Sequence, residues 1–284
     1  MYDTIVIGNG PAGITAAIYL KRFNYNPLVI GKDLGALENS GYIDNYYAVP
    51  HIKGSELIQK GIDQAKEFGI DVVTDEVISI EYGENGGFSV KALNNTYEGK
   101  TIFLATGKAR ARVIAKNLKE YEGKGISYCA ICDGFFYRGK KLGIVGNSHF
   151  MENELDTLRK FTKDITIFTN GLDTNVNDLP VVKDKIVSFV GDSNHLTGID
   201  TENNHYDLDG VFIAIGSANA FSFAKHLGLV MDDQQNIVVK DFQTNIPGIF
   251  AGGDVIGGLP QVAKSVGDGA CAAVEIKKYL TSSK

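Results

Sequence analysis

Two cysteines separated by two residues lie in the segment ISYCAICDGFFYRGKK, where Cys129 and Cys132 form a C-x-x-C pair and Asp133 follows directly. This spacing brings two sulfur atoms within reach of a disulfide and can lower the pKa of one thiol. Thiol–disulfide exchange needs an attacking thiolate, a resolving sulfur and a nearby proton carrier. Asp133 is placed to be that carrier, as a general acid–base group. The segment therefore predicts a redox-active site.

Two other uses of the cysteine pair are a zinc half-site and an inert pair. Zinc needs four ligands, but the only other cysteine is Cys271, and none of the five histidines lies within fifteen residues of the pair. An inert pair leaves the adjacent acid unexplained. Cys271 lies among small residues in GDGACAAVEIKKYL, which predicts a small buried packing residue. We therefore expect no metal site.

The N-terminal segment predicts a dinucleotide-binding turn between a strand and a helix. An apolar run over residues 4–7 leads into Gly8, Gly10 and Gly13 in a G-x-G-x-x-G pattern, and a second strand, NPLVI, follows the helix. Gly8 allows the tight turn, Gly10 lets a pyrophosphate approach the backbone, and Gly13 lets helix and strand pack closely. Asp33, twenty residues after Gly13, could accept a ribose hydroxyl.

Two later segments add to this turn. TIFLATGKAR is an apolar strand ending in Ala105, Thr106 and Gly107, and TNIPGIFAGGDVIG is a strand-like run ending at Asp254, followed by the helix QVAKSVGDGACAAVEIKKYL. An acid at a strand end beside a helix N-terminus suits a polyol hydroxyl and a nearby phosphate. Together the segments resemble the FAD-binding pattern of two-dinucleotide flavoproteins, which implies a split FAD-binding domain made of residues 1–108 and 217–284.

The stretch between these parts, residues 109–216, repeats the first unit. TIVIGNGPAG and LGIVGNSHFM align without gaps, so that Gly146 corresponds to Gly8, Ser148 to Gly10 and Met151 to Gly13. DITIFTNG is expected to form the second strand of this repeat, and YDLDGVFIAIGSA a late strand. The predicted fold class is therefore α/β, with two Rossmann-like domains of the two-dinucleotide-binding flavoprotein kind, the second inserted in the first.

The composition narrows the class of protein. A length of 284 residues, 44% hydrophobic with 33 glycines, fits two soluble α/β domains. A net charge of −6 argues against general nucleic-acid binding. The N-terminus lacks the basic segment and apolar run of a signal peptide, and no apolar run approaches the ~18 residues that span a bilayer. We expect a cytoplasmic protein that does not bind membranes.

With these motifs in this order, the chain resembles the low-molecular-weight thioredoxin reductases over essentially its whole length. The similarity rests on GNGPAG near the start, ATG at 105–107, CAICDGFF at 129–136, AIG at 214–216, AGGD at 251–254 and GDG at 267–269. It implies a homodimer with non-covalent FAD and thioredoxin as the partner. It further implies that Cys132 lies nearer the flavin, that Cys129 attacks the disulfide of thioredoxin, and that Asp133 is the acid–base residue.

The resemblance also implies which residues contact FAD. They lie in the first glycine turn, at the ends of the following strands and at the start of the last helix: Gly8, Gly10, Pro11, Ala12, Gly13, Asp33, Asn45, Val77, Ala105, Thr106, Gly107, Gly253, Asp254, Gln261, Val262 and Ala263. The domain rotation of the family implies that the cysteine pair alternates between flavin and thioredoxin.

The sequence departs from this family where NADPH should bind. Ser148 adds a side chain where the backbone should approach phosphate, and Met151 replaces a small residue. The basic cluster that pairs with the 2′-phosphate is replaced by Thr169, Asn170 and Gly171. We therefore predict that NADPH is not bound. This pattern resembles one branch of the family, the ferredoxin-dependent flavin thioredoxin reductases, which implies ferredoxin as the electron donor.

The charge distribution agrees with acidic partners. Residues 108–141 hold nine basic and three acidic side chains, although the whole chain carries −6. Acidic ferredoxin or thioredoxin could dock there by electrostatic steering. Three alternatives remain open: an NADPH-dependent reductase with an atypical nucleotide site, a related disulfide oxidoreductase with a second flavin in the degenerate domain, and a flavin-binding redox sensor or interaction protein.

Overall fold

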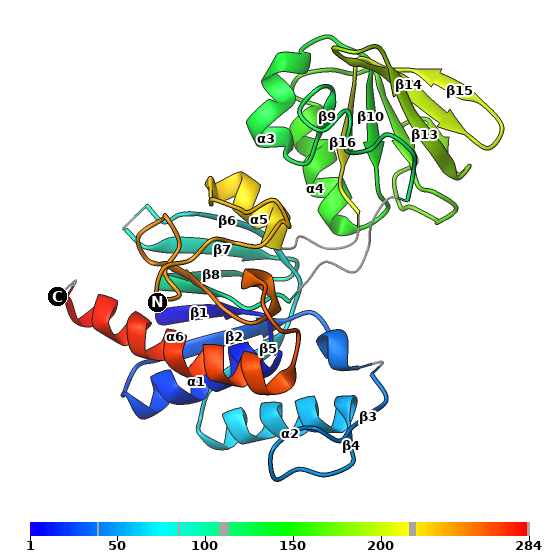
Figure 1. Ribbon diagram of the computed structural model, residues 1–284. Coiled ribbons are helices and arrows are strands. Elements are labelled where there is room, and N and C mark those ends of the chain that lie inside the picture. The colour runs from blue at the N-terminus through cyan, green and yellow to red at the C-terminus, as the bar shows by residue number, and fades with distance from the viewer. Residues whose placement is uncertain (39, 85, 108–113, 216–219, 283–284) are drawn as a thin grey trace. The chain divides into compact units, whose positions relative to one another are not determined.

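A computed structural model describes residues 1–38, 40–84, 86–107, 114–215 and 220–282 (Figure 1). The chain divides into two compact units. The first unit consists of residues 1–108 and 219–284, and the second unit consists of residues 109–218. In the main sheet of each unit, a central strand pairs in parallel with a neighbouring strand on both sides, as in the Rossmann fold. The predicted fold class, α/β with two Rossmann-like domains, is confirmed.

The sheet of the first unit has the strand order β5-β2-β1-β8-β7-β6, and β17 pairs with β8. The strands β5, β2, β1, β8 and β17 are parallel, whereas β6 and β7 form an antiparallel extension beside β8. The strands are β1 (Tyr2–Ile7), β2 (Pro27–Gly31), β5 (Asp71–Thr74), β6 (Val77–Tyr82), β7 (Phe88–Ala92), β8 (Thr96–Leu104) and β17 (Ile249–Ala251).

Helices and short elements complete the first unit. The helices are α1 (Pro11–Arg22), α2 (Gly54–Glu67), α5 (Ala220–Leu227) and α6 (Val262–Ser282). The short elements are the 3₁₀ helices η1 (Gly35–Leu37) and η3 (Asp254–Ile256) and the paired strands β3 (Tyr42–Ile43) and β4 (Ile52–Lys53).

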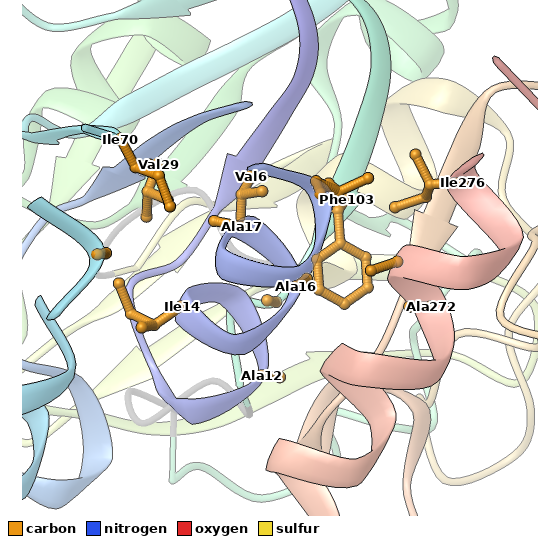
Figure 2. Packing of buried hydrophobic residues seen from close by; sticks show 14 of the residues in the cluster. Val6, Ala12, Ile14, Ala16, Ala17, Val29, Ile70, Phe103, Ala272 and Ile276 are labelled. Atoms are coloured by element: carbon orange, nitrogen blue, oxygen red, sulfur yellow. The ribbon is translucent and has the colours of Figure 1, made fainter. Parts of the chain in front are cut away.

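The core of the first unit joins the two ends of the chain. Ala16 of α1 and Ala272 of α6 lie on either side of Phe103 of β8, and all three are fully buried (Figure 2). Small side chains bring the two helices close together, since a Cβ atom on Gly269 would lie 2.2 Å from the carbonyl oxygen of Ala12. The helix after the glycine turn is therefore fixed by the C-terminal helix.

The sheet of the second unit has the strand order β12-β11-β10-β16-β9 and is parallel throughout. β10 lies between β11 and β16, just as β1 lies between β2 and β8. The strands are β9 (Ile126–Ser127), β10 (Leu142–Val145), β11 (Ile165–Phe168), β12 (Val181–Val182) and β16 (Gly210–Ile213).

The helices and the second sheet of this unit include elements on which the site depends. They are α3 (Ala130–Asp133), η2 (Gly134–Tyr137), α4 (His149–Leu158), and an antiparallel sheet of β13 (Ile186–Gly191), β14 (Leu196–Thr201) and β15 (His205–Asp207). Within the described parts of the chain, no helix is long and apolar enough to cross a membrane.

Two local interpretations of the sequence are wrong. The strand β17 does not reach Asp254. It ends at Ala251, because Gly253 takes a φ of 82°, which turns the backbone, and Asp254 then begins η3. Cys271 is exposed rather than buried. The buried stripe of α6 passes through Gly269, Ala272 and Ile276, and Cys271 lies on another face of the helix.

Candidate active site and cofactor turn

The cysteine pair forms a disulfide at the start of a short helix. The Sγ atoms of Cys129 and Cys132 are bonded, and their Cα atoms are 5.3 Å apart. Cys129 caps α3, and its Sγ accepts a hydrogen bond of 3.2 Å from the backbone N–H of Cys132. Cys129 is only 2% exposed, whereas Cys132 is exposed. An incoming molecule therefore meets Cys132 first, although the resemblance gives Cys129 the attack on thioredoxin.

Asp133 is held beside the disulfide by a residue that sequence reasoning missed. Ser127 of β9 donates a hydrogen bond of 2.6 Å to Oδ2 of Asp133, and its Oγ accepts one of 3.2 Å from the N–H of Cys129. The hydroxyl thus links the carboxyl group to the backbone of the first cysteine. A serine two residues before a C-x-x-C pair is the only signal that the sequence holds for this link.

The tyrosines around the disulfide are held in the neutral form. Burial raises the pKa of Tyr137, and the charge of Asp133 raises it further. Burial also raises the pKa of Tyr128, which donates a short hydrogen bond to Oε1 of Glu122. Neither phenol is therefore placed to take up the proton of a cysteine thiol near neutral pH, which leaves Asp133 as the best-placed proton carrier.

The first glycine turn is packed at two positions and open at the third. A Cβ atom on Gly8 would lie 2.3 Å from the carbonyl oxygen of Ala105, and one on Gly13 would lie 1.9 Å from that of Gly8. At Gly10 a Cβ atom would meet nothing within 4 Å. Thr106 Oγ1 is buried and has no hydrogen-bond partner within the described residues. The open space at Gly10 fits a pyrophosphate that approaches the backbone, and the unpaired hydroxyl of Thr106 is free to bind a ligand.

Some of the other residues expected to contact FAD lie in contact with one another or with the first turn. Nδ2 of Asn45 donates a hydrogen bond of 2.9 Å to Oε1 of Gln261. Gly253 packs against Ala12, since a Cβ atom on Gly253 would lie 3.0 Å from that of Ala12. The remaining members occupy predicted element ends: Pro11 begins α1, Gly107 follows β8, and Val262 and Ala263 begin α6.

Asp33 and Val77 lie in different parts of the strand order. Asp33 follows β2 near one end of the sheet, whereas Val77 begins β6 at the other end and pairs with Ala92 of β7. Asp33 is exposed, and its Oδ1 accepts a hydrogen bond of 2.7 Å from the N–H of Gly35. Its second carboxylate oxygen is therefore the one available to a ribose hydroxyl.

A lysine that sequence reasoning did not single out holds the loop around Asp254. Nζ of Lys264 donates to the carbonyl oxygens of Gly253 at 2.8 Å and Gly257 at 2.7 Å, and it pairs with Asp268 at 2.7 Å. Asp268 in turn accepts a hydrogen bond of 2.9 Å from the N–H of Gly253. This clamp fixes the backbone that presents Asp254.

The second glycine turn has the same backbone packing as the first, but larger side chains stand at two of its three glycine positions. A Cβ atom on Gly146 would lie 2.1 Å from the carbonyl oxygen of Ala214, the same relation as that of Gly8 to Ala105. Met151 is fully buried in the core that also contains Ile144. The Met151 side chain therefore packs in the core between α4 and the sheet.

Two amide side chains around the second turn bind their own chain, whereas two buried hydroxyls there have no partner among the described residues. Nδ2 of Asn147 donates a hydrogen bond of 3.1 Å to the carbonyl oxygen of Asp173, and Oδ1 of Asn170 accepts one of 2.9 Å from the N–H of Ile186. The hydroxyls of Ser148 and Thr169 are buried and unpaired within the described residues. Among the described residues, none of these four side chains forms a hydrogen bond with a lysine or arginine, although Lys183 pairs with the carboxylate of Asp173 at 2.6 Å.

The predicted basic stretch is only partly described. Lys108, Arg110 and Arg112 lie outside the described residues. The other six basic side chains of the stretch are exposed: Lys116, Lys119, Lys124, Arg138, Lys140 and Lys141. In the described part of the chain, no group of three or more His, Cys, Asp or Glu side chains could hold a metal ion.

Comparison with known proteins agrees with this geometry. The sequence profile of the pyridine nucleotide-disulphide oxidoreductases matches residues 2–171 and 180–269. A thioredoxin reductase of Listeria monocytogenes is 31% identical, with 100% of this chain and 95% of that protein covered. One from Bacillus subtilis is 30% identical, with 99% and 95% covered.

Two solved structures are similar over nearly the whole chain. The atypical thioredoxin reductase TRi from Desulfovibrio vulgaris Hildenborough has a TM-score of 0.92 and 34% identity, with 99% of both chains covered. A ferredoxin-flavin thioredoxin reductase from Clostridium acetobutylicum has a TM-score of 0.76 and 30% identity, with 99% of this chain and 98% of that chain covered.

Proposed function

The chain belongs to the low-molecular-weight thioredoxin reductases, FAD-dependent disulfide oxidoreductases of the pyridine nucleotide-disulphide family, and from that membership we propose that it takes electrons from reduced ferredoxin and passes them to thioredoxin. The electrons reach the Cys129–Cys132 disulfide through FAD. Two one-electron donations and two protons convert the disulfide into two thiols, and exchange with the disulfide of thioredoxin then restores it.

The observation that carries the choice of donor is Met151, fully buried beneath the turn that would have to receive a nicotinamide nucleotide. Its counterpart Gly13 has no room for a side chain, which shows how closely helix and strand approach in a turn of the dinucleotide-binding kind. The contact between Asn147 and the backbone of Asp173 further ties the loops on either side of the second turn to each other.

The FAD site is proposed in the first glycine turn. Gly10 and Thr106 offer space and an unpaired hydroxyl, and Asn45, Asp254 and Gln261 offer polar groups from the other chain segments. When bound there, FAD supplies the electron pair that opens the disulfide. Asp133, oriented by Ser127, holds or delivers the proton that the cysteine sulfur exchanges.

A docking surface for thioredoxin lies beside the exposed cysteine. Ile131, Phe135 and Phe136 are 54%, 63% and 75% exposed, and the guanidinium of Arg138 lies 5.5 Å from the ring centre of Phe135. Exposed apolar side chains next to a reactive sulfur suit a protein substrate. The exposed lysines of residues 114–141 suit acidic partners. The homodimer and the cytoplasmic location stay predictions.

The electron donor can be tested with the purified flavoprotein. Reduced ferredoxin, NADPH and NADH are supplied separately together with thioredoxin, while flavin absorbance and thioredoxin thiols are followed. We expect ferredoxin alone to support turnover. Rapid flavin reduction by NADPH would contradict the proposed donor. The Cys132→Ser variant is the control, because it should retain FAD yet leave thioredoxin oxidised.

A further inference from the structure

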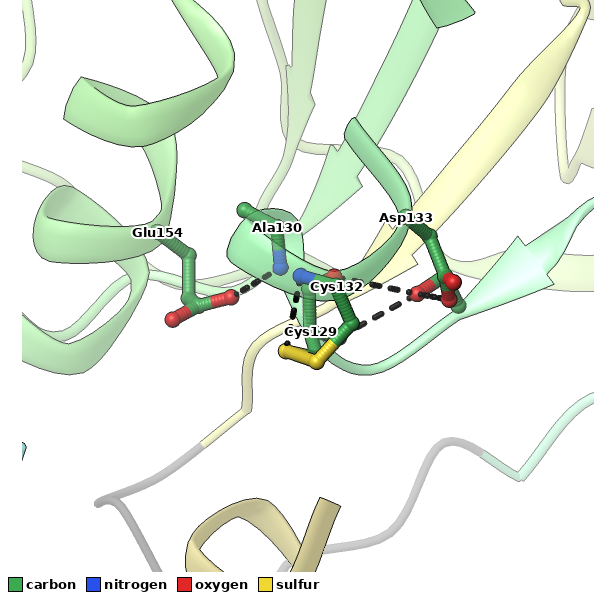
Figure 3. Close-up of a disulfide and its surroundings, with 6 residues drawn as sticks. Cys129, Ala130, Cys132, Asp133 and Glu154 are labelled. Atoms are coloured by element: carbon green, nitrogen blue, oxygen red, sulfur yellow. Dashed lines mark hydrogen bonds between the residues drawn. A yellow bond between two sulfur atoms is a disulfide. The ribbon is translucent and has the colours of Figure 1, made fainter. Parts of the chain in front are cut away.

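A buried carboxyl group contacts the redox turn from the side opposite Asp133 (Figure 3). Glu154 of α4 is 7% exposed, and its Oε2 accepts a hydrogen bond of 2.6 Å from the backbone N–H of Ala130. Among the described residues, no lysine, arginine or histidine forms an ion pair with Glu154. The carboxyl group of Glu154 is therefore bound to the backbone of the residue that directly follows Cys129.

The hydrogen bond fixes the turn between the two sulfurs. Ala130 is fully buried, so without Glu154 its N–H would lose its partner in a place that water does not reach. A buried N–H group without a hydrogen-bond partner destabilises the folded protein by about 1–3 kcal/mol. The same short helix uses the N–H of Cys132 to contact Sγ of Cys129. Two backbone N–H groups of α3 are thus used, one by Glu154 and the other by the sulfur of Cys129.

The groups that face the disulfide carry little positive charge. Asp133 lies on α3, Tyr137 on η2, Glu154 on α4, and Tyr128 directly precedes Cys129 with Glu122 at its hydroxyl. Burial raises the pKa of Glu154, while the hydrogen bond from Ala130 opposes that rise. When Glu154 is ionised, a thiolate at Cys129 adds a second negative charge to this turn, and two like charges in one place disfavour each other.

We propose that Glu154 is a positioning residue for the redox disulfide, which holds the turn through Ala130 and opposes the ionisation of the Cys129 thiol after reduction. The inference rests on the disulfide and not on ferredoxin, so it stands or falls separately from the proposed donor. Glu154 does not touch the sulfur atoms. Its two effects are a geometric one, carried by the oxygen acceptor, and an electrostatic one, carried by the charge.

Two substitutions separate these effects. Glu154→Gln keeps an oxygen acceptor and removes the charge, whereas Glu154→Leu removes both. Glu152→Gln is the matched control, because Glu152 lies on the same helix, is 28% exposed and binds His149 instead of the redox turn. All three are made in the full-length flavoprotein with Cys271→Ser, and circular dichroism with thermal unfolding checks that the second unit, which contains Glu154, is folded in each variant.

The charge is tested on Cys129 as the only thiol, in a Cys132→Ala background that keeps the backbone N–H at position 132. Carbon-13 at Cβ of Cys129 reports ionisation by its chemical shift as pH is changed. We expect Glu154→Gln to lower the pKa of the Cys129 thiol by about one unit, and Glu152→Gln to leave it unchanged. An unchanged pKa in Glu154→Gln would overturn the proposal.

The turn is tested with both cysteines present and dithiothreitol as the reductant. Two electrons and two protons pass from dithiothreitol to the protein disulfide, which leaves two protein thiols and the cyclic disulfide of the reagent. At pH 6 we expect Glu154→Leu to shift this equilibrium about fivefold toward the protein dithiol, and Glu154→Gln to stay within twofold of the parent protein. An unshifted equilibrium in Glu154→Leu would also overturn the proposal, whatever the electron donor of the enzyme.

Discussion

The side chain of Asn45 donates a hydrogen bond of 2.9 Å to the side chain of Gln261, which lies 216 residues later in the chain. Asn45 follows β3, and Gln261 directly precedes α6. Both residues belong to the set expected to contact FAD. The contact therefore joins the two chain segments of the first unit at the mouth of the proposed flavin site.

If Asn45 and Gln261 act on FAD as a pair, their effects on its affinity should not add. We expect Asn45→Ala and Gln261→Ala each to weaken FAD binding, and the double variant to lose about 1 kcal/mol less than the sum. Titration of the apoprotein with FAD, followed by flavin fluorescence, measures all four affinities. Strict additivity would show that the two side chains serve FAD independently.

The unpaired hydroxyl of Thr106 makes opposite predictions for the apoprotein and the flavoprotein. In Thr106→Val the apoprotein should gain about 1 kcal/mol of stability, because a buried hydroxyl without a partner is removed. FAD binding should weaken at the same time. Thr101→Val is the control, since Oγ1 of Thr101 lies 2.9 Å from that of Thr4 and from the carbonyl oxygen of Asp3, and its loss should destabilise the apoprotein.

Two glycines of the first turn should respond differently to alanine. Gly10→Ala should leave the apoprotein stable, because the added Cβ atom would meet nothing within 4 Å. The same Cβ atom blocks the approach of phosphate to the backbone, so FAD binding should weaken about tenfold or more. Gly13→Ala places a Cβ atom 1.9 Å from a carbonyl oxygen and should destabilise the apoprotein by about 3 kcal/mol. Thermal unfolding of apoprotein and flavin titration distinguish the two, and equal apoprotein stability would contradict the packing argument.

His205 should make the second unit more stable at lower pH. Hydrogen bonds to Asp200 and then to Asp207 raise the pKa of His205 above its ordinary value. The stabilisation is therefore complete below about pH 6.5 and is lost as pH rises through the raised pKa of the folded protein. Urea midpoints between pH 5.5 and 8.5 should fall more steeply with pH in the parent protein than in His205→Gln. Parallel profiles would exclude this linkage.

Local spacing was sufficient to identify both glycine turns and the redox pair. Gly8 and Gly13 are required by backbone atoms within the same strand–turn–helix unit, so a short motif carries the whole constraint. The correspondence of Gly146 to Gly8 also follows from a local repeat, and each glycine packs on the residue directly after a strand, Ala214 after β16 or Ala105 after β8.

Contacts between distant segments could not be read from the sequence in this way. Glu154 reaches Ala130 only because α4 packs beside α3, and nothing in the spacing of 24 residues indicates it. The exposure of Cys271 depends on which face of α6 meets α1, and a run of small residues gives no apolar contrast between faces. The end of β17 depends on one φ angle at Gly253.

The assembly of the first unit from both ends of the chain has a consequence during synthesis. Strand β8 gains its neighbour β17, and the alanine face of α1 its cover α6, only when the last part of the polypeptide leaves the ribosome. The second unit is encoded in one continuous stretch and is complete before that point. Synthesis from the N-terminus therefore completes the unit with the redox disulfide before the flavin site is complete. Until α6 is made, the apolar face of α1 is uncovered, and it is the surface through which the nascent chain could associate prematurely.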